Sequence, residues 1–286
     1  MGGVHTVTVG APAKINLGLR VLERRPDGFH EIETVLVAVT WSDKITIEEA
    51  AGLELTCSDP KLPTDERNLC LRAARLLSER LPAPTGARIH LEKRLPWGAG
   101  LGSGSSDAAT TLTGLCRLWD RSPPREALME MAATLGSDVP FFIDAHPALA
   151  EGRGERLTRL DTMIGGEPFN FPYTVAIAAP AIHISTAEAY AAVTPARRAG
   201  RSLAALVLDG EPRDWQRELK NDFEPSVFVR HPVLGRLKEQ FYGGGAAYAS
   251  LSGSGSAVYA LFADEATARA AIEQIDAPAW VGDALV

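Results

Sequence analysis

The sequence feature that most constrains this chain is a run rich in glycine and serine between a predicted strand and a predicted helix. Four glycines and three serines lie between Pro96 and Ser106. Alternating apolar residues predict a strand over 87–92, and an apolar stripe predicts a helix from about Ser106 to Trp119. Glycine lets backbone N–H groups approach an anion closely, and a helix N-terminus adds unpaired N–H donors. The run therefore favours a phosphate-binding loop over its other interpretation, a flexible linker.

Several common phosphate-binding loops do not match this run. A Walker loop needs a lysine after its last glycine, and the run has none. Dinucleotide-binding spacing from Gly98 and Gly100 needs a glycine at 103, where the chain has Ser103. The Val-Ala-Ile-Lys segment that follows the glycine loop of protein kinases is also absent. The sequence therefore indicates a different type of phosphate loop.

Three other segments contain candidate site residues. Lys14 and Asn16 alternate with Ile15 and Leu17, which places them on the polar face of a strand, where a lysine is usually solvated. Asp138 follows a helix over 125–135 that Gly136 is expected to end, and it precedes the apolar residues 139–142.

Asp138 has two interpretations. It is either an ordinary helix N-cap, or a carboxylate that apolar surroundings desolvate and bias toward base or charge-partner chemistry. The third segment, residues 251–258, reads Leu-Ser-Gly-Ser-Gly-Ser-Ala-Val. It is equally well a hairpin turn or a second glycine loop that lines a site.

Periodicity and capping patterns predict the other elements. Strands are expected at 7–9, 15–21, 31–39, 44–48, 173–179, twice within 248–262, and at 280–286. Helices are expected at 68–81, from the capping box of Ser185 and Glu188 to Val193, within 214–241 with breaks at Pro225 and Pro232, and at 264–275. Pro26-Asp27-Gly28 predicts a turn.

Length and composition limit the class of protein. The 286 residues suggest one large or two ordinary domains, and a composition shift over 152–171 divides them into 1–160 and 161–286. A formal net charge of -7 opposes a nucleic-acid partner. The three cysteines show no metal spacing and fit a reducing compartment, and no apolar run reaches the ~20 residues of a membrane helix. We therefore expect a cytoplasmic protein with no membrane partner, whose oligomeric state stays open.

Together these segments resemble the GHMP kinase superfamily. The matching segments follow one order: Pro-Ala-Lys at 12–14, the central loop 96–106 and Gly-Ser-Gly at 253–255. Arg-Pro-Asp-Gly-Phe-His-Glu at 25–31 and Gly-Ser-Asp-Val-Pro-Phe-Phe at 136–142 narrow the resemblance to the branch whose substrate carries a cytidine diphosphate group. The resemblance runs from Pro12 to about Phe262.

The resemblance implies an α+β two-domain fold, the GHMP kinase fold. Its N-terminal ATP-binding domain is an α/β domain like that of ribosomal protein S5, and its C-terminal domain is ferredoxin-like. The implied activity is transfer of a phosphoryl group from ATP, with Mg²⁺, to a tertiary hydroxyl of the cytidine-bearing substrate. The implied pathway is the non-mevalonate route to isoprenoid precursors.

The resemblance also implies roles for individual residues. Asp138 would take the proton from the hydroxyl, and Lys14 would pair with Asp138 and orient that hydroxyl. Asn68 and Lys93 would lie near the nucleoside of ATP. The residues expected around its phosphates are Pro96, Trp97, Gly98, Ala99, Gly100, Leu101, Gly102, Ser103, Gly104, Ser105 and Ser106.

The implied substrate site contains an aromatic pair. The cytosine would lie between Phe29 and Tyr190 and be hydrogen-bonded by His30, while Asn16 and Thr186 would line the substrate path. Two aromatic residues depart from the family pattern, since Phe29 stands where Tyr is usual and Tyr190 where Phe is frequent. Both departures keep base stacking possible. Ser103 replaces a glycine of many relatives and adds a hydroxyl.

The magnesium ligands and three alternatives stay open. Ser106 is a candidate ligand, and Asp107 is either a neighbour of the metal or a partner of the helix dipole.

The first alternative function is another kinase of the superfamily, of the homoserine or mevalonate type, and Phe29, His30 and Tyr190 discriminate against it. The second is a non-catalytic nucleotide-binding or RNA-binding module. The third is an ATP-using decarboxylase, for which the sequence offers no evident cationic cluster.

Overall fold

The computed structural model describes residues 5–81, 86–196 and 200–286. These residues pack into two compact units, and each unit draws on separate stretches of the chain. The first unit takes described residues from 1–13, 42–95 and 102–144, and the second takes those from 14–41, 96–101 and 145–286. Strands β1 (Thr6–Arg24) and β2 (His30–Ala50) contribute residues to both units. The division into domains at 160/161 stays a prediction.

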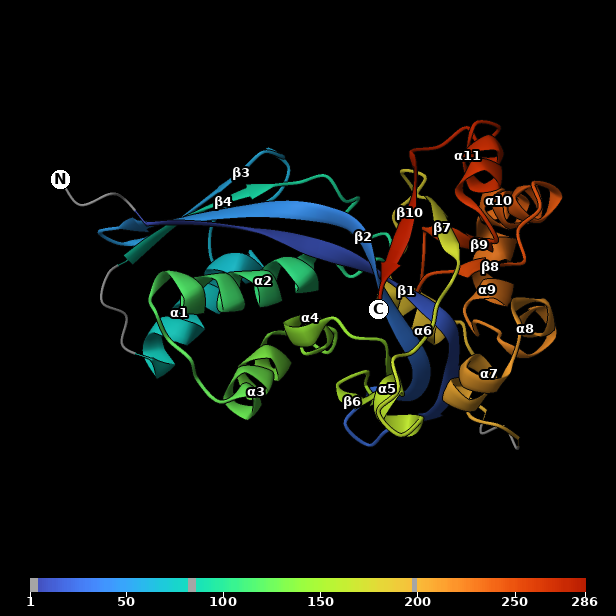
Figure 1. Ribbon diagram of the computed structural model, residues 1–286, viewed down its shortest axis with the longest axis horizontal. Helices are drawn as coiled ribbons and strands as arrows, with labels where there is room; N and C mark the ends of the chain where they lie inside the picture. Colours follow the sequence, from blue (N-terminus) through green and yellow to red (C-terminus); the bar gives the residue numbers. More distant parts are fainter. Residues whose placement is uncertain (1–4, 82–85, 197–199) are drawn as a thin grey trace. The chain divides into compact units, whose positions relative to one another are not determined.

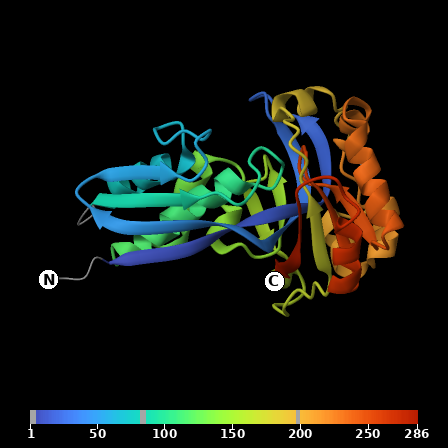
Figure 2. The same ribbon diagram turned by 90° about the horizontal axis from the view of Figure 1, so that it is seen from above.

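In the first unit, helices cover one face of a sheet (Figures 1 and 2). Strand β4 (Gly86–Glu92) pairs antiparallel with the second half of β2, and β3 (Leu53–Cys57) pairs parallel with β4. Ala87, Ile89 and Leu91 are buried, as the alternating pattern of β4 predicts. The helices of this unit are α1 (Leu69–Arg80), α2 (Ser103–Leu118), α3 (Arg125–Leu135) and α4 (Phe141–Asp144).

A glycine allows α2 to lie close to the sheet. A Cβ atom on Gly114 would come within 2.6 Å of Ile47 Cδ1 on β2. A larger residue at 114 would therefore push α2 away from the strand. This contact matters because the first turn of α2 is the end of the predicted phosphate loop.

In the second unit, β5 (Ala148–Gly152) pairs antiparallel with the first half of β2, and β6 (Arg156–Arg159) pairs with β5. Strand β10 (Ala279–Leu285) joins β2 to β7 (Thr174–Ala178), which continues through β9 (Val258–Phe262) to β8 (Tyr248–Leu251), all antiparallel. The helices are α5 (Leu160–Met163), α6 (Thr186–Ala191), α7 (Leu203–Asp209), α8 (Pro212–Glu218), α9 (Glu224–Arg230), α10 (Pro232–Gly243) and α11 (Glu265–Ile272).

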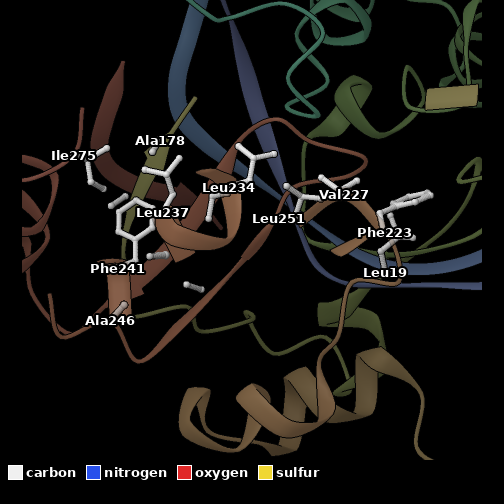
Figure 3. Packing of buried hydrophobic residues seen from close by; sticks show 14 of the residues in the cluster. Leu19, Ala178, Phe223, Val227, Leu234, Leu237, Phe241, Ala246, Leu251 and Ile275 are labelled. Atoms are coloured by element: carbon white, nitrogen blue, oxygen red, sulfur yellow. The ribbon is translucent and has the colours of Figure 1, made fainter. Parts of the chain in front are cut away.

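The hydrophobic core of the second unit lies between these strands and helices (Figure 3). Leu234 and Phe241 of α10 are fully buried, together with Ala178 of β7 and Leu251 of β8. Phe223, just before α9, belongs to the same cluster. The core therefore holds the glycine-rich segment after β8 on a rigid support.

Many of the predicted elements are confirmed. Helix α3 has the predicted bounds, and α1 begins directly after Asn68. Ser185 accepts a hydrogen bond from the N–H of Glu188 at the start of α6. The predicted turn before β2 is present, since the Gly28 N–H donates to the Arg25 carbonyl at 3.0 Å. None of the helices in the described ranges combines the length and apolar character needed to cross a bilayer.

The prediction of two separate strands over 31–39 and 44–48 is wrong, because β2 continues through both ranges. Asp43 lies between the two predicted ranges, and its buried carboxylate accepts hydrogen bonds from the N–H groups of Arg94 and Leu95. Tertiary partners thus satisfy a polar residue inside a strand. The residues next to Asp43 in the sequence do not indicate these partners.

One helix start differs from the prediction: α2 begins at Ser103 instead of about Ser106, because Gly102 supplies the left-handed turn before it with φ 70°. The predicted breaks within 214–241 are confirmed, since separate helices meet there and Pro225 and Pro232 lie in the first turns of α9 and α10. A proline at a helix start loses no hydrogen bond, since the first N–H groups of a helix have no partner within it. Strands β3, β5 and β6 and helices α4, α5 and α7 have no counterpart among the predicted elements.

Candidate active site

Lys14 and Asn16 form a buried pair in the second unit. Each residue is only 3% exposed, although the strand pattern is typical of a solvated face. Lys14 Nζ donates to Asn16 Oδ1 at 2.6 Å and to the Gly100 carbonyl at 2.8 Å. The Lys14 N–H also donates to the Leu101 carbonyl at 3.0 Å. The ammonium group is therefore held directly against residues 96–101 of the predicted phosphate loop.

Asn16 is oriented by residues that the sequence analysis missed. Its Nδ2 donates to Thr34 Oγ1 at 3.0 Å, and that hydroxyl donates to the Gly18 carbonyl at 2.6 Å. The Tyr259 hydroxyl donates to the Asn16 carbonyl at 2.6 Å. These bonds fix which end of the Asn16 amide faces Lys14. Thr34 lies on the strand after Asn16, so only strand pairing could have indicated it.

The second glycine-rich segment connects β8 to β9 and packs against the first loop. Ser252 Oγ donates to the Gly100 carbonyl at 2.9 Å, and the Ala257 N–H donates to the Ala99 carbonyl at 2.9 Å. A Cβ atom on Gly100 would lie 2.0 Å from the Ser252 carbonyl oxygen. The hairpin interpretation of this segment is confirmed, because the segment connects two antiparallel strands, and the connection packs against residues 96–101.

Asn221 binds the backbone of this hairpin connection through its side-chain amide. Its Nδ2 donates to the carbonyls of Leu251 and Gly253, each at 2.8 Å, and its Oδ1 accepts the N–H of Phe223 at 3.0 Å. Asn221 is 1% exposed. It gave no signal in the sequence, because an isolated asparagine between helices is usually a loop residue.

The remainder of the predicted phosphate loop forms the first turn of α2 in the first unit. Gly102 precedes the helix, and no described side chain caps its first N–H groups. Ser106 Oγ is buried, and among the described residues it has no hydrogen-bond partner. Uncapped N–H groups at the start of a long helix, beside an unpaired hydroxyl, suit a bound anion or an ion carried with it.

Lys93 and Asp107 join the two ends of the loop. Lys93 Nζ lies 2.5 Å from Asp43 Oδ2 and 2.9 Å from Asp107 Oδ2, and these three side chains are almost fully buried. Burial raises the pKa of Asp107 to about 7. Asp107 thus has a third role that the sequence analysis did not consider, as the buried partner of Lys93. Asp43 was missed altogether.

Asn68 and Asp138 also lie in the first unit. Asn68 is the N-cap of α1: its Oδ1 accepts the Cys70 N–H at 2.9 Å, and its Nδ2 donates to the Pro63 carbonyl at 2.8 Å. Asp138 is half-buried in the turn between α3 and α4, directly before the fully buried Val139. The apolar neighbours expected after Asp138 are therefore present.

The residues expected around a cytosine lie in the second unit. The rings of His30 and Tyr190 stack with centroids 4.8 Å apart, and Tyr190 meets the buried Phe223 edge-on at 4.9 Å. Phe29 is 52% exposed at the turn before β2. Burial, followed by the charge of Arg24, lowers the pKa of His30, a shift that favours its neutral imidazole. The exposed Thr186 begins α6, and its Oγ1 lies 3.3 Å from Ser254 Oγ.

Comparisons with known proteins identify the family of this chain. A model of the GHMP kinases N terminal domain matches residues 68–145, and a model of the GHMP kinases C terminal domain matches residues 203–279. The chain belongs to the GHMP kinase family. The kinase family uses ATP as phosphate donor, and the two matches confirm the expected two-domain fold.

Individual relatives make the comparison more specific. The chain is 52% identical over 266 residues to the 4-diphosphocytidyl-2-C-methyl-D-erythritol kinase of Salinibacter ruber, covering 93% of each chain. A crystal structure of 4-(cytidine 5'-diphospho)-2C-methyl-D-erythritol kinase superposes with a TM-score of 0.79 at 35% identity, covering 97% of this chain and 99% of that one. Homoserine kinase from Cytophaga hutchinsonii has a TM-score of 0.74 at 19% identity, covering 97% and 93%, which shows the shared fold alone.

Proposed function

We propose that this kinase transfers the γ-phosphoryl group of ATP to the 2-hydroxyl of 4-diphosphocytidyl-2-C-methyl-D-erythritol, in the non-mevalonate route to isoprenoid precursors. The observation that carries the proposal is the stacked His30–Tyr190 pair, with centroids 4.8 Å apart, in a chain that also has the kinase phosphate loop. A substrate with a nucleobase needs such aromatic surfaces, whereas homoserine and mevalonate have no base to stack. The relatives of that name support the same substrate.

In this proposal the acceptor hydroxyl is activated by two charged side chains. Asp138 takes the hydroxyl proton while the hydroxyl oxygen forms a bond to the γ-phosphorus, and the bond from that phosphorus to the bridging oxygen breaks to release ADP. Lys14 orients the hydroxyl and pairs with Asp138. The two hydrogen bonds from Lys14 Nζ to Asn16 and Gly100 support this role, because they fix where the ammonium lies.

The proposed ATP site consists of residues 96–106 with Asn68 and Lys93. The uncapped first turn of α2 supports it, since phosphate oxygens can accept hydrogen bonds from the N–H groups there. Phosphoryl transfer depends mainly on positioning and on electrostatic stabilisation of the phosphates. The buried contacts of Gly100 and of Lys93 would therefore contribute by holding the loop in one conformation.

Mg²⁺ belongs to the proposal, and the buried, unpaired Ser106 Oγ fits it. Ser106 would hold the ion together with phosphate oxygens, and the ion would offset phosphate charge. Within the described ranges no group of three or more His, Cys, Asp or Glu side chains is arranged for a metal ion. Magnesium in kinase sites typically has few protein ligands and keeps phosphate and water ligands.

The residues of the proposed substrate site lie in the second unit. Cytosine would lie between Phe29 and Tyr190, and the neutral His30 could both donate and accept hydrogen bonds on the edge of the base. Asn16 and Thr186 would line the path of the substrate. We also propose a cytoplasmic location, which the three free cysteines support, and no nucleic-acid or membrane partner.

Release of ADP tests the proposal directly. Purified protein with magnesium-ATP would be given 4-diphosphocytidyl-2-C-methyl-D-erythritol, homoserine or mevalonate in parallel. Rapid ADP release only with the cytidine compound is the expected result. Turnover of homoserine or mevalonate instead would support kinase activity and contradict the proposed cytosine site.

A further inference from the structure

Arg153 lies over the ring of Phe29, and neither the phosphate loop nor the proposed proton transfer requires this arginine. The guanidinium carbon of Arg153 is 5.0 Å from the centroid of the Phe29 ring. A cation at this distance over an aromatic face is attracted by the ring quadrupole. The contact is notable because the ring is 52% exposed.

Strand pairing brings the two residues together. Strand β5 pairs with β2 so that Gly152 lies opposite Ile32. The turn after β5 and the turn before β2 therefore lie at the same end of this strand pair. Arg153 belongs to the first turn and Phe29 to the second.

Both turns hold their backbones rigidly. The Phe29 N–H donates to Asp27 Oδ1 at 3.1 Å, and the Phe29 carbonyl accepts the Arg25 N–H at 2.8 Å. The Arg153 N–H donates to Glu155 Oε2 at 2.6 Å, and its Nε lies 3.8 Å from Glu155 Oε1. Phe29 and Arg153 are thus each held at the backbone, and the guanidinium lies over one face of the Phe29 ring.

We propose that Arg153 is a positioning residue for substrate binding, which holds the Phe29 ring in one orientation so that its other face can stack on the cytosine. This inference rests on the proposed function. The guanidinium occupies one face of the ring, so a base can stack only on the opposite face. A ring that is already oriented loses less conformational freedom when the base binds. Orienting the Phe29 ring therefore strengthens substrate binding and does not change the rate of phosphoryl transfer.

A double-mutant cycle tests the inference. Arg153→Leu is expected to raise the KM for 4-diphosphocytidyl-2-C-methyl-D-erythritol about two- to fivefold, the range of a cation–π contact at an exposed site, with kcat and the KM for ATP unchanged. In a Phe29→Leu background the same substitution is expected to have no further effect. Arg153→Lys, which keeps a cation, should recover part of the affinity.

The matched control is Arg156→Leu, because Arg156 lies in the same hairpin but pairs with Glu31 instead of a ring. It should leave all three kinetic constants unchanged. An equal effect of Arg153→Leu with and without Phe29 would mean that Arg153 contacts the substrate itself, which would overturn the inference and leave the proposed function intact. A wild-type protein that does not turn over the cytidine compound would overturn both.

Discussion

Lys14 Nζ donates a 2.6 Å hydrogen bond to Asn16 Oδ1, two residues along the same strand and equally buried. Residues at i and i+2 lie on the same face of a strand, so the sequence places both side chains together. Because Lys14 also donates to the Gly100 carbonyl, its position is tied to the phosphate loop.

Removing the ammonium group should slow turnover. We expect Lys14→Ala to lower kcat by about 10²-fold, the typical loss of one positioned donor at a reacting oxygen. Steady-state ADP release measures this, with Lys44→Ala as the control, since the Lys44 side chain is 44% exposed. Normal turnover of Lys14→Ala would make this lysine a structural residue.

Neutralising the proposed base should affect chemistry more than binding. Asp138→Asn keeps the shape of the side chain, and we expect kcat to fall by ~10²–10⁴-fold while the KM for the cytidine substrate changes little. Asp144→Asn is the matched control, because Asp144 pairs with Arg125 near the surface of the same unit. An unchanged kcat in the Asp138 variant would remove this residue from the mechanism.

The buried carboxyl of Asp107 should make stability depend on pH. Burial raises its pKa from an ordinary 3.8 to about 7, so the folded chain binds this proton more tightly than the unfolded chain. The contribution to the free energy of unfolding is therefore complete below about pH 4 and is lost as the pH rises toward 7. The Asp107→Asn variant lacks this pH-dependent contribution to the free energy of unfolding.

Urea denaturation between pH 5 and pH 7 measures this effect. Relative to the wild type, Asp107→Asn should gain stability as the pH rises, by up to about 1.4 kcal/mol per pH unit. Asp65→Asn, at a carboxylate whose side chain is 57% exposed, should not show this gain. A constant difference between Asp107→Asn and the wild type across this range would contradict the raised pKa.

A single methyl group in the phosphate loop should destabilise the second unit. Gly100 has φ 79°, and its added Cβ atom would lie 2.0 Å from the Ser252 carbonyl oxygen. We expect Gly100→Ala to cost about 1–3 kcal/mol and to lower kcat/KM. Gly104→Ala is the control for stability, because a Cβ atom there meets nothing within 4 Å. Equal melting temperatures for the two variants would show that the loop can move away from Ser252.

Local sequence patterns were enough to predict the secondary structure around the candidate site. Glycines and serines between a strand and an apolar-striped helix predicted a phosphate loop, and the helix N-terminus is present at Ser103. The alternation of Lys14 and Asn16 predicted that they share a face. The helix after the run and the shared face of Lys14 and Asn16 are confirmed, because backbone conformation and periodicity depend on residues close in sequence, whereas phosphate binding stays a prediction.

The contacts between distant residues that support this site became visible in the folded chain alone. Thr34, Asn221 and Asp43 each satisfy hydrogen bonds of residues far along the chain, and none has a local pattern that indicates its partner. Lys14 was expected on a solvated face, but it is buried because the segment 96–101 covers it. A buried polar group needs partners, and their identity depends on which strands and loops pack together, a property of the fold that no short stretch of sequence contains.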